Sequence, residues 1–228
     1  MSEYLTALFF ATFVECELIL EKLKDYKKIT ILEHIFFKGK INKLSLLLCL
    51  SGVGKINSAI SATLAFEKFN IKRAIISGIA GAYPSSGLEV GDIAVAEKEI
   101  DADKGLLINC EDREDSFIFI NSEEIILQVP DFLKQLKRGT FLTVSACTGN
   151  LSRAKFFEKR FKAICENMEG AAVAKVAQIY GIPVSEIRSI SNIVTDRNEL
   201  LKIDDVKKNA LIIQDFMLEN LPLIVESL

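Results

Sequence analysis

Two short segments place an acidic and an amide side chain at the ends of predicted secondary-structure elements. The segment ENMEGAAVA, residues Glu166–Ala174, begins a helix at the acidic Glu169, and RSISN, residues Arg188–Asn192, ends an apolar strand with a short amide side chain. An ionised carboxylate accepts two hydrogen bonds, which suits a vicinal diol, and an amide both donates and accepts, which suits the edge of a 6-oxopurine. Because α/β proteins bind ligands where strands end, we expect Glu169 and Asn192 to lie at one rim of a sheet.

A third candidate follows the first predicted strand, where Glu15 and Glu17 stand two residues apart. A carboxylate at the carboxyl end of a buried strand can act as a general base. Structural explanations exist for all three candidates. Acidic residues such as Glu15 and Glu169 stabilise the start of a helix, and Asn192 is a residue type that forms turns.

Two glycine-containing segments follow predicted strands. SGVGK, residues Ser51–Lys55, is not a phosphate-binding loop, because Ile56 stands where that motif needs Ser or Thr, and it is not a dinucleotide fingerprint, because Asn57 stands where that needs glycine. A tight turn before a helix explains it. In GIAGAY, Gly78 and Gly81 allow close approach of the backbone, and the amides there could bind a hydroxyl, a water or an anion.

The composition excludes several classes of function. The net charge is −3, with basic residues scattered among acidic ones, so the sequence gives no electrostatic case for binding nucleic acid. His34 is the only histidine, which rules out multi-histidine metal sites, and it has no neighbouring nucleophile for a catalytic triad. The five cysteines contain no CxxC pair and are predicted to be mostly buried thiols. We therefore expect no metal and no cofactor.

The sequence gives no indication of a membrane-spanning segment or of a secretory signal. No apolar stretch of membrane-spanning length is free of charge, and the N-terminal segment lacks the basic region of a secretory signal. We expect a cytoplasmic protein without a membrane partner.

Strand-like apolar runs alternate with helical patterns along the 228 residues. This alternation, without linker or internal repeat, predicts a single domain over residues 1–228. The predicted fold is α/β: a three-layer αβα sandwich around a central mixed, largely parallel sheet. The predicted strands are Leu5–Thr12, Ile29–Phe37, Leu44–Leu50, Arg73–Ser77, Asp92–Glu99, Gly139–Ser145, Phe161–Cys165 and Val184–Ser191. The predicted helices are Glu15–Lys24, Ile56–Phe69, Leu151–Lys159, Glu169–Tyr180 and Asp204–Leu221.

Two weaker predictions complete this assignment. The basic cluster Lys22–Lys28 is interpreted as a solvated helix end, and SEEIILQVPDFLKQL, residues 122–136, as one helix or two that break at Pro130. FIFIN, residues 117–121, is predicted to be a short strand. Glu186 and Arg188, in the last strand, are assigned structural roles in which they pair with each other or with neighbours.

These motifs together resemble the superfamily of nucleoside phosphorylases and nucleosidases. The resemblance spans most of the chain: the Glu after the first strand, SGVGKINSA, SGIAGAYPSSGLEVGDIAVA, ENMEGAAVA and RSISN occur in matching order and spacing. The chain looks similar to two branches, 5′-methylthioadenosine/S-adenosylhomocysteine nucleosidase and futalosine hydrolase. TGN, ENMEGAAVA and the pair Asp196–Arg197 after RSISN resemble the second more closely.

The resemblance implies roles for individual residues. Glu15, or Glu17 if the alignment slips, would activate water, and Met168 with Glu169, beside Asn167, would bind the ribose. The remaining implied contacts are Ile79, Ala80 and Gly81 in the glycine loop, and Thr148, Gly149 and Asn150 near the base. Asn192 occupies the place where adenine-specific nucleosidases have Asp, and in this superfamily Asn resembles the choice for 6-oxopurines.

The resemblance therefore implies hydrolysis of the N-glycosidic bond of futalosine, which carries hypoxanthine, in the alternative menaquinone pathway. The partners would be a purine nucleoside and water, and the family assembles as a homodimer. An adenine-specific nucleosidase and a non-catalytic nucleoside-binding protein stay open as alternatives. A phosphorolytic enzyme is a further alternative, but it would need a basic phosphate pocket, and no Arg cluster near SGVGK supplies one; Arg153 is a remote candidate for it.

Overall fold

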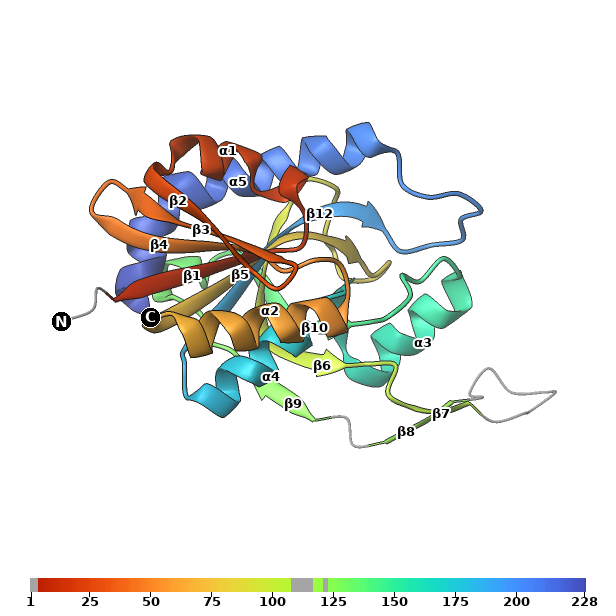
Figure 1. Ribbon diagram of the computed structural model, residues 1–228. Helices are drawn as coiled ribbons and strands as arrows, with labels where there is room; N and C mark the ends of the chain where they lie inside the picture. The colour runs from red at the N-terminus through yellow and green to blue at the C-terminus, as the bar shows by residue number, and fades with distance from the viewer. Residues whose placement is uncertain (1–3, 108–116, 121–122) are drawn as a thin grey trace.

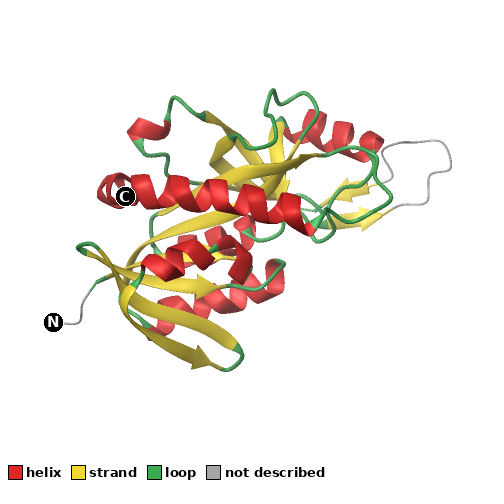
Figure 2. Ribbon diagram, turned by 90° about the horizontal axis from the view of Figure 1, so that it is seen from above, coloured by secondary structure: helices red, strands yellow, loops and turns green. Residues whose placement is uncertain are grey.

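A ten-stranded mixed sheet with helices on both faces organises the computed structural model, which describes residues 4–107, 117–120 and 123–228 (Figure 1). Figures 1 and 2 show α1 and the long helix α5 over one face, and Figure 1 shows α2 and α4 against the other. This arrangement confirms the predicted α/β fold with its central mixed sheet. Within the described residues, no helix is both long and apolar enough to cross a membrane.

The elements follow one another in the strand–helix alternation that the sequence predicts. The strands of the sheet are β1 (Leu5–Phe10), β2 (Lys24–Ile31), β3 (His34–Ile41), β4 (Leu44–Leu50), β5 (Ile71–Ala82), β6 (Ile93–Asp101), β9 (Glu124–Ile126), β10 (Lys137–Thr143), β11 (Ala163–Asn167) and β12 (Val184–Ile193). A separate hairpin pairs β7 (Gly105–Leu107) with β8 (Phe117–Phe119). The helices are α1 (Glu17–Lys22), α2 (Lys55–Lys68), α3 (Leu151–Phe161), α4 (Gly170–Tyr180) and α5 (Ile203–Ser227), with 3₁₀ turns at Phe13–Glu15 and Asp131–Leu133.

The register of the central strands brings distant segments together at one edge. β1 lies between β4 and β5 and is parallel to both, and β5 is parallel to β12. Near the end of β5, Gly81 pairs with Asn192 of β12 and with Glu166 of β11. The carboxyl ends of β5, β11 and β12 therefore meet, and this is where α/β folds bind ligands.

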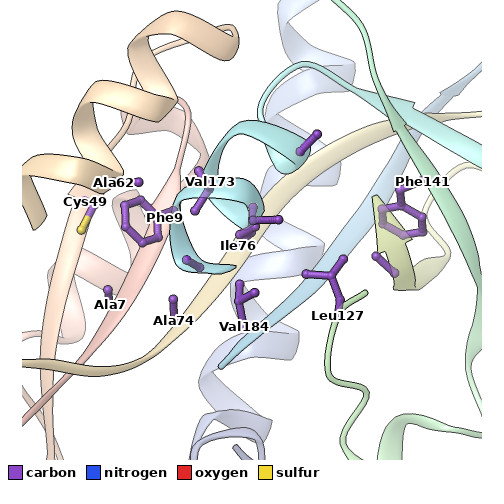
Figure 3. Close-up of a cluster of buried hydrophobic side chains, with 14 of the residues drawn as sticks. Ala7, Phe9, Cys49, Ala62, Ala74, Ile76, Leu127, Phe141, Val173 and Val184 are labelled. Carbon is purple, nitrogen blue, oxygen red and sulfur yellow. The ribbon is translucent and has the colours of Figure 1, made fainter. Parts of the chain in front are cut away.

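Two apolar layers hold the helices to the sheet. On one face Phe9 and Ile76 of the sheet pack with Val173 of α4 and Ala62 of α2 (Figure 3). On the other face the sheet packs against α1 and α5, where Met217 is fully buried. Burial of such side chains stabilises each by about 1.5–3 kcal/mol, so both helical layers fix the strand ends rigidly.

The predicted strand Ile29–Phe37 is wrong, because the chain turns inside it. β2 and β3 form an antiparallel hairpin around Leu32, which has a φ of 54° and is exposed. The basic cluster Lys22–Lys28 consequently lies largely in β2 and not at a helix end.

The helix predicted over residues 122–136 is also wrong. β9 pairs with β6 in this stretch, and exposed and buried residues alternate along it, with Ile125 and Leu127 in the core and Ile126 exposed. That period of two is the pattern of a strand, and the only helical part is the 3₁₀ turn Asp131–Leu133. The predicted strand FIFIN is present as β8 over Phe117–Phe119.

Candidate active site

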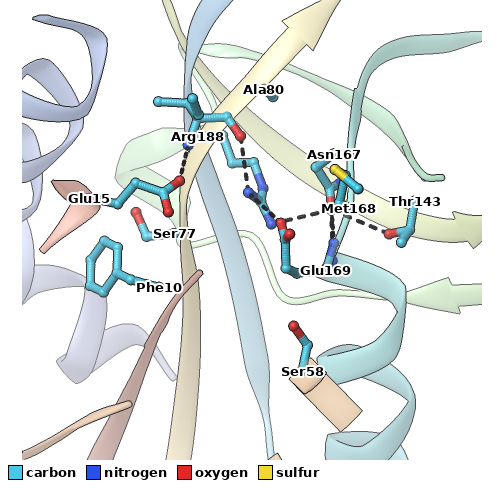
Figure 4. Close-up of polar contacts among 12 residues, drawn as sticks. Phe10, Glu15, Ser58, Ser77, Ala80, Thr143, Asn167, Met168, Glu169 and Arg188 are labelled. Carbon is cyan, nitrogen blue, oxygen red and sulfur yellow. Dashed lines mark hydrogen bonds and ion pairs between the residues drawn. The ribbon is translucent and has the colours of Figure 1, made fainter. Parts of the chain in front are cut away.

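A cavity of about 180 Å³ lies where the ends of β5, β11 and β12 meet the turn after β1, at the edge of the sheet where α/β folds bind ligands. Most of the predicted site residues line it, namely Glu15, Ile79, Ala80, Gly81, Asn167, Met168, Glu169 and Asn192. They come from four segments far apart in the sequence, and Figure 4 shows several of them around one point.

The predicted base-contacting loop, residues 148–150, lies beside the cavity and does not form its wall. Thr148 is buried and its amide donates to Glu166 Oε1 at 2.6 Å, while Asn150 caps the N-terminus of α3. Gly149 packs against Arg197. The neighbouring Cys147 lines the cavity instead and is exposed. Cys16, Cys49 and Cys165 are buried as predicted, and Cys110 lies outside the described residues.

Glu15 lies in the 3₁₀ turn after β1 and is held by three donors. Its Oε2 accepts from the amide and the hydroxyl of Thr12, each at 2.9 Å, and its Oε1 accepts from the amide of Ile79 at 3.1 Å (Figure 4). A side chain at Gly78 would place its Cβ 2.5 Å from Glu15 Oε1, and the φ of 145° there also favours glycine. Gly78 therefore makes room for the carboxylate.

The surroundings of Glu15 favour a base. Burial raises the pKa of Glu15 above the ordinary 4.5, and the charge of Glu169 raises it further, while Arg188 and the hydrogen bonds from the Ile79 amide and the Thr12 side chain act in the opposite direction. Three of about four lone-pair positions of the carboxylate are occupied, which leaves one for a water molecule. A carboxylate of raised pKa accepts a proton from such a water more readily.

Glu169 caps α4 and receives its partners from two directions. Its Oε1 accepts from the amide of Gly54 at 3.1 Å, and its Oε2 lies 3.5 Å from Nη1 of Arg188. SGVGK is thus more than a tight turn, because its backbone orients an acidic side chain of the cavity. Gly54 adopts a φ of 90°, which places this amide and which glycine tolerates.

We use the name floor for the buried polar cluster beneath Glu169, formed by Arg188, Asn167, Thr143, Glu99 and Glu186. Arg188, at 1% exposure, donates to Glu186 Oε1 at 2.6 Å, to the carbonyl of Ile79 at 3.0 Å and to Asn167 Oδ1 at 3.3 Å.

Asn167 holds the start of α4 in place. Its Oδ1 accepts from the amides of Glu169 at 2.9 Å and Gly170 at 2.7 Å. The bond from Arg188 to Glu186 confirms the predicted pairing of these two residues. Through Asn167, both belong to the network that positions Glu169.

Two carboxyl groups of the floor contact each other. Glu99 and Glu186 are both fully buried, and their carboxyl groups lie close together, because a Cβ on Gly170 would lie 2.1 Å from Glu99 Oε1 and 2.6 Å from Glu186 Oε1. Burial and the charge of Glu186 raise the pKa of Glu99 well above its usual range. Two adjacent carboxylates cannot both ionise in a buried site, so Glu99 carries a proton and Glu186 carries the charge opposite Arg188.

We use the name rim for Asn192, Arg197 and Cys147, which also line the cavity. The register between β12 and β5 shifts between Ile190 and Asn192, a bulge that re-aims the Asn192 side chain. Its Oδ1 accepts from the Ser191 hydroxyl at 2.9 Å, which leaves its Nδ2 as a donor.

Several residues of the site have no clear signature in the sequence. Glu99 lies 68 positions from Asn167, to which it is hydrogen-bonded, and no local spacing connects them. Arg197 belongs to the Asp196–Arg197 pair that carries part of the family resemblance, and it follows the last strand and Asn192 by a few residues. That position predicts a location near the strand ends.

Comparisons with known proteins place the chain in a family. The model of the phosphorylase superfamily matches residues 7–218. An aminodeoxyfutalosine nucleosidase of Campylobacter jejuni is 30% identical, over 88% of this chain and 91% of the relative. A 5′-methylthioadenosine/S-adenosylhomocysteine nucleosidase of Staphylococcus haemolyticus is 27% identical, over 82% of this chain and 85% of the relative.

A solved structure extends this likeness to the fold. The structure of a futalosine hydrolase mutant of Helicobacter pylori superposes with a TM-score of 0.82 at 26% identity, covering 99% of this chain and 100% of the other. The match covers the sheet, the helices and all segments that line the cavity. The chain belongs to the phosphorylase superfamily, and the relatives that it resembles are nucleosidases.

Proposed function

We propose that the protein hydrolyses the N-glycosidic bond of futalosine and releases hypoxanthine. The observation that carries the proposal is that the amide of Asn192 lines the same cavity as the two carboxylates Glu15 and Glu169. Two acids and one amide around a single cavity meet the three demands of the reaction, which are a bound sugar, an activated water and an oriented leaving purine.

The sugar is held by Glu169. Its carboxylate keeps lone pairs free beside the contacts to Gly54 and Arg188, and these accept from the 2′ and 3′ hydroxyls of a ribose. As the bond to the purine breaks, the sugar becomes a cation of oxocarbenium character. The nearby negative charge of Glu169 stabilises that cation, because the floor has already fixed its orientation.

The water is positioned and deprotonated by Glu15. Proton transfer by a positioned carboxylate contributes on the order of 10²–10⁴ in rate. The same carboxylate argues against phosphorolysis, since a phosphate dianion at this place would face both Glu15 and Glu169. The charge of the floor cation, Arg188, is already opposed by Glu186, and Arg188 also lies beside Glu169, so it does not form a phosphate pocket.

The purine is oriented by Asn192. Its Nδ2 can donate to N7 of the purine, while its Oδ1 is engaged by Ser191. An Asp at this position could carry a proton to N7, and an amide cannot. The site therefore favours a purine that leaves with its charge spread over an exocyclic oxygen, as hypoxanthine does.

A second candidate function is hydrolysis of an adenine nucleoside, which the names of the relatives from Campylobacter and Staphylococcus favour. A base-release assay separates the two. Futalosine, aminodeoxyfutalosine, methylthioadenosine and inosine are each incubated with purified protein, with and without phosphate.

Fastest release from futalosine, independent of phosphate, is the expected result. Faster release of adenine from aminodeoxyfutalosine or methylthioadenosine would establish the second candidate. Ligand binding without any base release would indicate a nucleoside-binding protein.

A further inference from the structure

Among the described residues, the guanidinium of Arg197 has no acidic side chain as an ion-pair partner. Its guanidinium lines the cavity, and its Nη1 is buried without a hydrogen-bond partner. The neighbouring acid, Asp196, accepts from the amide of Leu151 at 2.8 Å. The side chain of Cys147 lies next to Arg197, but a thiol sulfur is only a weak hydrogen-bond acceptor. An unsatisfied buried donor costs about 1–3 kcal/mol, more if charged, which an acceptor on a ligand would remove.

The backbone fixes the place of Arg197. Its amide donates to the carbonyl of Gly149 at 3.2 Å. A Cβ on Gly149 would lie 3.3 Å from Arg197 Cγ and 3.6 Å from its Nε, so the absence of a side chain there lets the arginine stem lie close against the loop. Arg197 therefore lines the same cavity as Asn192, and its stem is held against the loop at Gly149.

We propose that Arg197 is a specificity-determining residue that donates hydrogen bonds to O6 of the leaving purine, beside Asn192 on N7. This inference rests on the proposed function and specifies its substrate class as nucleosides of 6-oxopurines. On that edge a 6-oxopurine presents two acceptors, N7 and O6, whereas adenine presents an acceptor and an amino donor. A guanidinium has donors only and stays protonated, so it pairs with the first edge and opposes the second.

A contact between Arg197 and O6 would also stabilise the negative charge of the leaving purine, which the neutral amide of Asn192 does less well. The electron pair of the broken glycosidic bond remains on the purine, and in hypoxanthine it delocalises onto O6. A positive donor at O6 stabilises that developing charge without any proton transfer from the protein. Arg197 therefore contributes to turnover as well as to the choice of base.

The test compares Arg197→Met and Arg197→Lys with the wild-type protein on futalosine and aminodeoxyfutalosine, two nucleosides that differ at position 6 of the purine. We expect Arg197→Met to lower kcat/KM for futalosine by about 10- to 150-fold, the value of one hydrogen bond to a charged group. For aminodeoxyfutalosine kcat/KM should stay unchanged or rise. Arg197→Lys should recover part of the loss on futalosine, because it restores a charged donor.

Two measurements separate this role from a structural one. Hypoxanthine should bind Arg197→Met about 10-fold or more weakly than wild type in calorimetry, with adenine unaffected. Arg153→Met is the matched control: Arg153 is exposed on α3, with its guanidinium 4.8 Å from the Phe157 ring, and its loss should change neither substrate by more than about twofold.

Each contrary outcome has a distinct meaning. Equal losses on both nucleosides, with inosine unaffected, would overturn the inference and place Arg197 on the shared 5′ substituent. Equal losses on all three would make Arg197 structural and also overturn it. A wild-type protein that releases adenine and no hypoxanthine would instead overturn the proposed function itself.

Discussion

The floor and the rim of the cavity differ in how their polar groups are satisfied. In the floor, Arg188 has protein partners on Nε, Nη1 and Nη2, and Asn167 uses both ends of its amide. At the rim, Arg197 has an unpartnered Nη1 and Asn192 keeps its Nδ2 as a donor. The donors of Arg188 and Asn167 are engaged before a ligand arrives and so position groups, while Glu186 Oε2 is the floor oxygen without a hydrogen-bond partner. Donors left open within a cavity recognise the ligand.

This contrast suggests a division between sugar chemistry and base recognition. The floor orients Glu169, and through Ile79 it also contacts the loop that holds Glu15. Loss of a floor residue should therefore reduce stability together with activity. Loss of a rim residue, or of Glu15 at the water, should reduce activity while the fold stays intact.

The largest expected effect is that of Glu15→Gln. This substitution keeps the shape of the side chain and removes the proposed general base. Glu15→Gln should lower turnover of futalosine by about 10²–10⁴-fold, the usual contribution of a general base. Its unfolding temperature should stay close to that of wild type, because removing a buried charge offsets the hydrogen bond lost where the amide NH2 replaces an accepting oxygen. Turnover within threefold of wild type would remove Glu15 from the mechanism.

The next effect tests the floor. Glu186→Ala leaves the charge of Arg188 buried without its 2.6 Å partner, and such a loss costs about 3–5 kcal/mol of unfolding free energy. Glu99→Gln is the matched control, since an amide reproduces the donor of a protonated carboxyl and should cost about 1 kcal/mol or less. Denaturant unfolding of both variants measures the difference. If Glu99→Gln were as destabilising as Glu186→Ala, the proton would not reside on Glu99.

The smallest effect is a shift in pH dependence. Glu15 must be ionised to accept a proton, so kcat/KM should fall as the pH falls through its pKa. Burial and Glu169 raise that pKa and Arg188 lowers it, with a net upward shift, so the acid limb should lie above pH 4.5. The same shift means that Glu15 destabilises the fold as pH rises through that pKa. An acid limb at or below 4.5 would contradict the assigned environment.

The sequence predicts the strand ends of this site better than the residues beneath them. Glu15, Glu169 and Asn192 follow strands or begin a helix, and those positions converge in any fold of this class. The structure accordingly places all three around one cavity. The α/β alternation is also visible in the sequence, because long apolar runs and helical periodicity need no knowledge of partners.

The remaining features depend on contacts between distant segments. Glu99 and Glu186 are charged residues in strands, a pattern that usually indicates a solvated face, yet both are fully buried since each has a polar partner from elsewhere in the chain. The stretch Glu124–Ile126 forms a strand because β6 offers an edge to it. The local sequence reveals neither the distant polar partners of these carboxyl groups nor the strand edge that β6 offers.

One competition experiment tests the central claim most directly. Equal concentrations of futalosine and aminodeoxyfutalosine are mixed with the protein in phosphate-free buffer, and hypoxanthine and adenine are followed together by chromatography. The ratio of initial rates equals the ratio of the two kcat/KM values. We predict that hypoxanthine is released at least about tenfold faster, the value of one base contact of 1.4 kcal/mol. Faster release of adenine, or release of either base only after phosphate is added, would contradict the account.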